Sequence, residues 1–252
     1  MTCRQSEREL IEAELYELGT LGITEQDLPG EVCELEAFFP VPFNEQPAFA
    51  NYQPHWSQHA EAEWVDTFEP FPVGQRLYVV PAWRAEPAPP GRLRLPVYAR
   101  QASGSGYQPA TQLALEALEQ HLHEGDRFLD VGAGSGILSA AAELLGAGPR
   151  FACDIDLEAL AEARENHTPA HLFGGSPRSI ASGSMDLVAA NLNAEALLNL
   201  QSDLLRVLAP GGRLILSGFT LRNADRLSQS FGAEVLESLA SGNWRAVILR
   251  KR

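Results

Sequence analysis

Glycines and an acid are clustered in the segment FLDVGAGSGILSAAAELLG, between an apolar run and an alanine-rich run. Asp130 precedes Gly132, Gly134 and Gly136. Glycines at a strand-to-helix turn let the backbone approach a ligand closely, because no Cβ stands in the way. The alternative is a tight turn that binds nothing. A second acid downstream, Asp154, favours a ligand site.

The type and spacing of these residues favour a cationic ligand over a phosphate. The dinucleotide fingerprint G-x-G-x-x-G requires a glycine at the position of Ile137. Asp130 would repel a phosphate, and no Lys follows the loop as it would in a P-loop. S-adenosylmethionine carries a sulfonium and an ammonium and has no phosphate. We therefore expect Asp130, Gly132 and Gly134 to contact S-adenosylmethionine, with an NAD-linked oxidoreductase as the less favoured alternative.

Asp154 ends the next apolar run and is the expected partner of a ribose. A carboxylate there can accept hydrogen bonds from both ribose hydroxyls, in NAD enzymes and S-adenosylmethionine enzymes alike. Asp154 therefore does not separate these two classes. Asp156 is the expected N-cap of the following helix.

Asn191 ends the run MDLVAAN, where open α/β sheets bind ligands at the carboxyl ends of their strands. An amide oxygen there can accept a hydrogen bond from an attacking amine and aim its lone pair. Asn191 is therefore the candidate catalytic residue and a further cofactor contact. Asn193 is expected to cap the helix that follows.

The elements that would position these residues alternate regularly from residue 109 onwards. Strands that alternate with helices predict an α/β fold, a parallel sheet covered by helices on both faces. The last two strands are joined only by the turn SGN, so they should form an antiparallel hairpin at the sheet's edge. The expected helices cover residues 109–122, 136–146, 157–166, 194–208 and 222–231, and the expected strands 127–131, 150–155, 171–173, 185–191, 213–218, 233–240 and 243–251.

The front of the chain has a different pattern. Residues 6–19 carry apolar side chains on one helical face, with Ser6 as the expected N-cap, and short strands are expected at 21–24 and 33–40. Further on, RLYVV and RLRLPVYARQ are typical of strands. We divide the chain into a small acidic α+β domain at 1–62, a linker and strand region at 63–101, and a cofactor-binding domain at 102–252.

The net charge of −14 is concentrated in the front of the chain, where residues 1–69 hold 15 acids against Arg4 and Arg8. Nucleic-acid affinity comes largely from cations that neutralise phosphates, so direct nucleic-acid binding is not expected. A basic protein is a better partner for this surface. The alternative is that the acids only solvate surface helices.

Composition also bears on location, redox state and metals. No stretch approaches the roughly 20 apolar residues of a membrane helix, and the first residues are charged where a signal peptide would be apolar, so we expect a cytoplasmic protein. Cys3, Cys33 and Cys153 are read as reduced thiols. His55 and His59 are four apart but lack a third ligand nearby, so no metal is expected.

Several motifs together resemble the PrmA family, the bacterial methyltransferases of protein eleven of the large ribosomal subunit. They are ELGTLGITE and AFFP near the start, FEPFPVGQRLYVVPAW in the middle, LDVGAGSGILSAAAELLGA, AANLNAE, and NWRAVIL near the end. The resemblance covers most of the chain. The middle motif and the A-N-L-x-A run are fairly specific to the family, whereas the glycine motif alone is not.

This resemblance implies a Rossmann-like class I methyltransferase domain behind a small substrate-recognition domain. It implies cofactor contacts at Thr111, Gly132, Asp154 and Asn191, and methylation of amines of a basic ribosomal protein, on lysine side chains or the α-amino group. Transfer to a neutral amine needs mainly positioning, so we expect no catalytic triad and no obligatory general base. We expect a monomer.

Two features depart from the family pattern. The family's loop F-G-T-G-x-H-P-T-T is SGSGYQPAT at residues 103–111, which keeps Gly106 and Thr111 and so still predicts a loop that covers the cofactor. The front domain is expected to lack a strand before its first helix. The alternative reading is therefore a homologue that binds S-adenosylmethionine but has another substrate or has lost catalysis.

Overall fold

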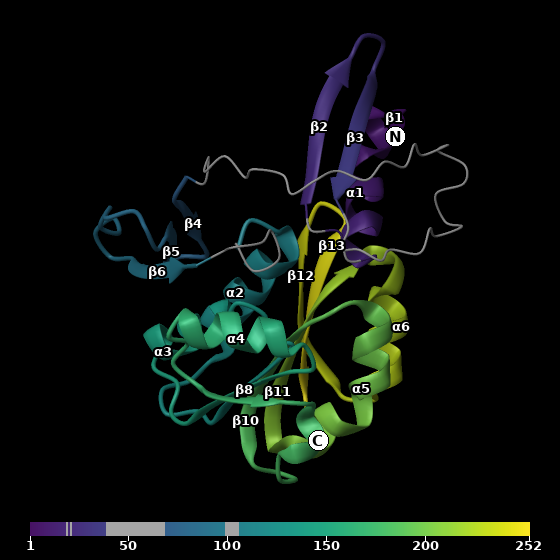
Figure 1. The fold of residues 1–252 in the computed structure, drawn as a ribbon. Coiled ribbons are helices and arrows are strands. Elements are labelled where there is room, and N and C mark those ends of the chain that lie inside the picture. The colour runs from purple at the N-terminus through teal and green to yellow at the C-terminus, as the bar shows by residue number, and fades with distance from the viewer. Residues whose placement is uncertain (19, 21, 39–68, 99–105) are drawn as a thin grey trace. The chain divides into compact units, whose positions relative to one another are not determined.

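The computed structural model of the protein describes residues 1–18, 20, 22–38, 69–98 and 106–252 (Figure 1). The chain divides into two compact units, Met1–Phe68 and Glu69–Arg252, and each is described by itself. The expected domain boundaries near residues 62 and 101 fall outside the described residues and stay predictions.

The smaller unit packs one helix against a three-stranded antiparallel sheet, and its described core is formed by buried side chains of α1, β1 and β3, among them Ile11, Leu15 and Leu35. The expected helix and two strands are confirmed. In chain order the elements are β1 (Thr2–Arg4), the 3-10 helix η1 (Gln5–Glu7), α1 (Arg8–Glu17), β2 (Gly22–Leu28) and β3 (Val32–Phe38).

Two predictions for this unit are wrong. A strand does precede the first helix, because β1 pairs with β3 and places Cys3 opposite Cys33. Three residues are too few to display the alternation that marks a strand in a sequence. Ser6 is not the N-cap: it lies inside η1, where the Glu7 carboxylate accepts a hydrogen bond from the Arg4 N–H at 3.2 Å and starts the helical turn earlier. All three cysteines are buried and free, as expected of reduced thiols.

The larger unit is built on a seven-stranded sheet of order β12-β13-β11-β10-β7-β8-β9. Five neighbouring strands run parallel, in the spatial order β11, β10, β7, β8 and β9. Strand β13 is antiparallel to both of its neighbours, β11 and β12. The α/β class and the antiparallel edge hairpin are thus confirmed. The strands are β7 (Phe128–Val131), β8 (Arg150–Asp154), β9 (His171–Gly174), β10 (Met185–Asn191), β11 (Leu208–Thr220), β12 (Glu234–Ser241) and β13 (Trp244–Arg250).

Helices cover both faces of this sheet, which explains why β7 and β10 are such apolar strands. Helices α5 and α6 pack on the face that presents Leu129 and Val131, and α2 and α3 pack on the other (Figure 1). Among the described residues no helix is long and apolar enough to cross a membrane. The helices are α2 (Pro109–His121), α3 (Ile137–Leu145), α4 (Leu157–Glu165), the 3-10 helix η3 (Pro177–Ser179), α5 (Ala194–Val207) and α6 (Leu221–Phe231).

A second, three-stranded sheet belongs to the larger unit and supports α2 and α3. Its strands are β4 (Phe71–Val73), β5 (Leu77–Pro81) and β6 (Leu93–Val97), with β5 and β6 parallel. Glu119 of α2 accepts hydrogen bonds from the backbone N–H groups of Gln75 and Arg76, both at 2.9 Å. The β4–β5 turn is therefore attached to α2.

Strand β11 contains an irregularity beside the end of β10. The pairing of β11 with β13 shifts between Leu216 and Phe219. Gly218 lies in this shift with φ +91°, and a Cβ on it would lie 2.5 Å from the Leu192 carbonyl oxygen and 2.7 Å from the Leu192 nitrogen. The backbone after β10 thus packs directly on the backbone of β11.

We predict that Gly218→Ala destabilises the larger unit much more than Gly211→Ala does. Both glycines lie on β11 at positive φ, but no atom lies within 4 Å of a Cβ built on Gly211. Gly211→Ala should therefore cost only the left-handed strain, about 1–2 kcal/mol. Gly218→Ala must also displace the Leu192 backbone. Urea denaturation followed by circular dichroism measures both, and equal losses would contradict the packing argument.

Candidate functional site

Three of the predicted site residues meet at one edge of the large sheet. Strands β8 and β10 are the parallel neighbours of β7, and in their register Val131 of β7 lies opposite both Cys153 and Ala190. Gly132, Asp154 and Asn191 follow or end these strands, and the N–H of Gly132 donates to the Cys153 carbonyl at 2.9 Å. The carboxyl edge of a parallel sheet is the usual ligand site of this architecture.

The three glycines of the loop have positive φ values and different surroundings. Gly132, Gly134 and Gly136 have φ of +74°, +52° and +85°. A Cβ on Gly132 would collide with the Leu192 side chain, and one on Gly136 with Thr168. Around Gly134 no atom lies within 4 Å of such a Cβ. Gly134 is therefore where the loop backbone faces open space.

Ile137, which replaces the third glycine of the dinucleotide fingerprint, begins α3 and supports the neighbouring loop. Its Cδ1 lies 3.0 Å from the position of a Cβ on Gly106. Gly106 is buried with φ +82°, and Tyr107 stacks on Phe71 with ring centroids 4.6 Å apart. The expected covering loop is therefore anchored at its end, while residues 103–105 lie outside the described part.

Asp154 holds the glycine loop in place. Its Oδ2 accepts from the Gly134 N–H and its Oδ1 from the Asp156 N–H, both at 3.0 Å. A carboxylate has further lone pairs, so these bonds leave acceptors for ribose hydroxyls. Asp156 accepts from the Glu158 N–H at 2.8 Å, which confirms it as the cap of α4.

Asp130 is buried, with 1% of its surface exposed, on the face covered by α3. Its Oδ2 accepts from the backbone N–H of Ser139 at 3.1 Å and from the Ser139 hydroxyl at 2.8 Å. Burial raises the pKa of Asp130 to about 7, although the hydrogen bonds from Ser139 oppose this shift. Its Oδ1 has no partner among the described residues. Such an atom is an acceptor that a bound ligand or water can satisfy.

Asn191 is held between two hydroxyl groups on neighbouring elements. Its Nδ2 donates to Thr111 Oγ1 of α2 at 3.1 Å, and its Oδ1 accepts from Ser217 Oγ of β11 at 3.0 Å. Thr111 and Ser217 are buried, and Asn191 is half-buried. Asn193 accepts from the Ala196 N–H at 2.9 Å, which confirms it as the cap of α5.

Sequence reasoning missed two features of this edge. Ser217 is one, and the available signal was a polar residue at the end of the apolar run RLILS, in the strand beside Asn191. The other is a pair of exposed apolar side chains, Ile155 and Leu157, which are 83% and 70% exposed and follow Asp154. Apolar residues interspersed with acids in DIDL were the available signal.

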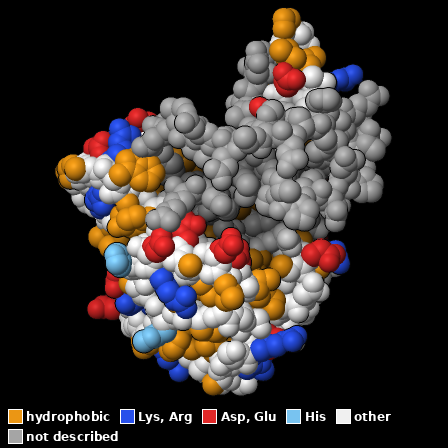
Figure 2. Space-filling view, viewed as in Figure 1, with side chains coloured by type: hydrophobic (Ala, Val, Ile, Leu, Met, Phe, Trp, Pro, Cys, Tyr) orange, Lys and Arg blue, Asp and Glu red, His pale blue; other side chains and the backbone are white. Residues whose placement is uncertain are grey.

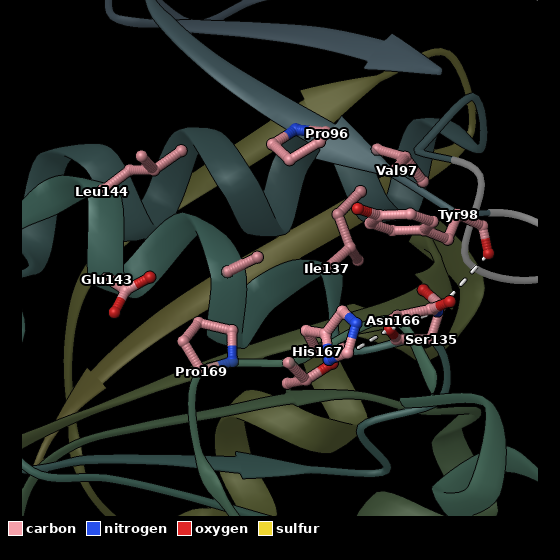
Figure 3. A pocket seen from close by; sticks show the side chains of 13 residues that line it. Pro96, Val97, Tyr98, Ser135, Ile137, Glu143, Leu144, Asn166, His167 and Pro169 are labelled. Carbon is pink, nitrogen blue, oxygen red and sulfur yellow. Dashed lines mark hydrogen bonds between the residues drawn. The ribbon is translucent and has the colours of Figure 1, made fainter. Parts of the chain in front are cut away.

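A cavity of about 220 Å³ lies behind the glycine loop, between β6, α3 and the turn after α4 (Figure 3). The Asn166 amide donates to the carbonyl oxygens of Ser135 and Tyr98, at 3.2 and 3.4 Å. None of the predicted site residues lines this cavity. The hydrogen bonds of Asn166 thus connect the glycine loop to the chain that follows β6. The predicted cofactor contacts lie outside this cavity.

The structure describes no cluster of three or more His, Cys, Asp or Glu side chains that could hold a metal ion in the ranges it covers. His55 and His59, the pair weighed as metal ligands, lie outside those ranges.

A sequence model described as ribosomal protein L11 methyltransferase (PrmA) matches residues 44–252. The chain belongs to the PrmA family. The resemblance seen in the sequence is thereby confirmed, and S-adenosylmethionine is the cofactor, as the loop residues predict.

Individual relatives agree with this assignment. The ribosomal protein L11 methyltransferase of Ralstonia pickettii is 37% identical over 192 residues, which cover 74% of this chain and 63% of the relative. That of Burkholderia multivorans is 38% identical over 69% of this chain and 60% of its own length. The chain thus spans less than two thirds of these curated relatives. A solved ribosomal protein L11 methylase of Lactobacillus delbrueckii matches with a TM-score of 0.65 and 29% identity, over 73% of this chain and 99% of that one.

The residues of this PrmA family member fit a cationic cofactor. Two carboxylates flank the loop, Asp130 in β7 and Asp154 at the end of β8, and among the described residues neither is paired with a Lys or Arg side chain. The buried Oδ1 of Asp130 has no partner in the described part, and the backbone at Gly134 is open. Which atoms of the cofactor they contact stays a prediction.

We predict that Gly134→Ala abolishes most cofactor binding without an unusual loss of stability. Gly232, at the end of α6, has a similar φ of +58° and similar open space, so Gly232→Ala is the matched control. Both variants should lose the same stability through left-handed strain. Only Gly134→Ala should lose the rise in Tm that S-adenosylmethionine causes. An undiminished rise in that variant would show that the loop backbone does not approach the cofactor.

We predict that Asp130→Asn changes how stability depends on pH. Because the folded pKa of Asp130 is raised from 3.8 to about 7, its contribution is fully present below pH 3.8 and is lost as pH rises through 7. Asparagine mimics the protonated form at every pH. The stability of the wild type relative to the variant should therefore fall between about pH 4 and pH 7 and stay level above that, by a few kcal/mol at most, since one pKa unit is about 1.4 kcal/mol. Thermal unfolding in matched buffers measures this difference, and a constant difference would refute the raised pKa.

Proposed function

We propose that this protein transfers a methyl group from S-adenosylmethionine to amino groups of ribosomal protein L11, on lysine side chains or the α-amino group. The observation that carries this proposal is the Asn191 amide, held between Thr111 and Ser217 beside the glycine loop. It offers an acceptor for an amine N–H at the edge where the cofactor loop lies. Membership of the PrmA family supports the same reading.

In this proposal the chain's own residues act mainly by positioning the cofactor and the amine. The cofactor supplies an electrophilic methyl group on its sulfonium. The backbone at Gly132 and Gly134 would lie against the cofactor, Asp154 would accept from its ribose hydroxyls, and Asp130 would offer a carboxylate to its cationic part. Thr111 and Gly106 would shape the end of the site that holds the methionine part of the cofactor. Positioning of this kind lowers a barrier through near-attack geometry alone.

Asn191 is the proposed catalytic residue. Its Oδ1 accepts an N–H of the neutral amine and directs the nitrogen lone pair towards the methyl group. The amine first loses a proton to solvent, and its neutral nitrogen would then form the N–C bond as the S–C bond breaks and the thioether leaves, so the proposed step requires no catalytic triad, metal ion or obligatory general base.

The smaller unit has a surface suited to a basic protein. Along β3 the side chains of Cys33 and Leu35 are buried while those of Glu34 and Glu36 are exposed, so one face of this strand is acidic. Opposite charges steer association and favour the correct partner. We propose that this unit recognises the ribosomal protein.

The described face of the larger unit that Figure 2 presents has no purely basic surface of the kind that binds nucleic acid. On the face that Figure 2 presents, basic side chains are interspersed with acidic and apolar ones. We propose that the protein acts in the cytoplasm as a monomer, without direct nucleic-acid contacts.

The altered covering loop, SGSGYQPAT, favours a second candidate, a homologue that binds S-adenosylmethionine but acts on another substrate or none. The two candidates differ in what happens to purified L11 and not in cofactor binding.

We predict that the purified protein incorporates labelled methyl groups from S-adenosylmethionine into L11, and that Asn191→Ala slows this transfer by about 100-fold. A group that acts on the transition state should change kcat far more than cofactor affinity, which we expect within about threefold. Scintillation counting measures the label, and calorimetric titration measures cofactor binding.

The matched control is Asn193→Ala, which removes the cap of α5 but leaves the Asn191 amide in place. It should cost about 1 kcal/mol of stability and leave transfer near the wild-type rate. Equal losses of transfer and cofactor binding in Asn191→Ala would overturn its catalytic role. Cofactor binding without any label on L11 in the wild type would favour the second candidate.

A further inference from the structure

Ser217 lies at a bulge in β11, directly beside the proposed catalytic amide. Strand β11 is parallel to β10, where Ser217 is the register partner of Asn191, and antiparallel to β13. Because Leu216 pairs with Val247 and Phe219 pairs with Arg245, two residues of β11 stand opposite one of β13. Bulges of this kind often occur next to active sites and redirect a side chain.

The hydroxyl of Ser217 restrains the carbonyl end of the amide. It donates to Asn191 Oδ1 at 3.0 Å, and the residue is fully buried. An amide oxygen has two lone pairs, so one remains for an incoming amine. The Nδ2 end is restrained separately by Thr111 at 3.1 Å.

The orientation of such an amide needs support from its neighbours. The last torsion of an asparagine side chain has broad, shallow minima, so the side chain does not fix the plane of its own amide. With a hydrogen bond at each end, the amide is held as part of a buried polar network, which is stiffer than a single contact.

We propose that Ser217 is a positioning residue for methyl transfer, whose hydroxyl fixes the plane of the Asn191 amide so that its free lone pair faces the amine. This inference rests on the proposed function. Ser217 then affects the rate of methyl transfer only through Asn191. It takes no part in cofactor binding, which the glycine loop provides.

A double-mutant cycle tests the inference, with the wild type, Ser217→Ala, Asn191→Ala and the double variant assayed on purified L11. Ser217→Ala should lower kcat by about tenfold, because small misplacements of a positioned group cost rate. The KM for L11 and the Kd for S-adenosylmethionine should stay within about twofold. In the Asn191→Ala background the same substitution should change kcat by less than about twofold.

The matched control is Ser228→Ala on α6. It also removes a hydroxyl bonded inside the protein, to the Ala224 carbonyl at 2.8 Å, but it lies on an element that supplies no site residue. It should leave kcat at the wild-type value. Ser217→Cys is a second variant for the case that alanine destabilises the fold: it fills the same space, while its thiol donates only weakly. It should keep the wild-type Tm and show most of the loss in kcat.

Three results would overturn the role of Ser217 while the proposed function stands. They are an unchanged kcat in both Ser217 variants, a tenfold loss that persists in the Asn191→Ala background, and a loss of cofactor affinity as large as the loss of rate. A wild-type protein that does not methylate L11 is a different result, since it overturns the proposed function and the inference with it.

Discussion

The close packing of Leu192 against two glycines is the constraint on which the site depends. Its side chain occupies the space that a Cβ of Gly132 would need, and its backbone occupies the space that a Cβ of Gly218 would need. One residue therefore joins the cofactor loop after β7 to the bulge in β11. Asn191 precedes Leu192 directly, so the proposed catalytic amide cannot move independently of either strand.

Electrostatics at the same edge distinguish this loop from loops that bind phosphate. A phosphate loop is organised around an anion by N–H groups and a cation. Here a carboxylate of the protein takes the place of the anion, because Asp154 accepts a hydrogen bond from the Gly134 N–H, which could otherwise donate to a phosphate. The Gly134 N–H is thus satisfied by an acid of the protein, and the negative charge of that acid suits a ligand that brings positive charge.

The sequence predicted those features that depend on local patterns. The alternation of helices and strands, the caps Asp156 and Asn193, and the edge hairpin all follow from neighbouring residues, and all are present. The features it missed depend on partners far along the chain. Strand β1 exists because β3 pairs with it, and Ser217 matters because the sheet register places it beside Asn191. The contact of Thr111 with that amide joins residues 80 positions apart, and only the family resemblance pointed to Thr111.

The position of β13 has a consequence for the order in which the molecule can form. This strand, Trp244–Arg250, lies between β11 and β12, and the bulge at Ser217 is defined by its pairing with β13. During synthesis on the ribosome, β11 is complete before β13 has been made. The edge of β11 that faces away from β10 therefore stays unpaired until β13 is added. Before that point the bulge at Ser217 lacks the strand whose pairing defines it. The site beside Ser217 is therefore complete only after that strand has been made and has taken its place in the sheet.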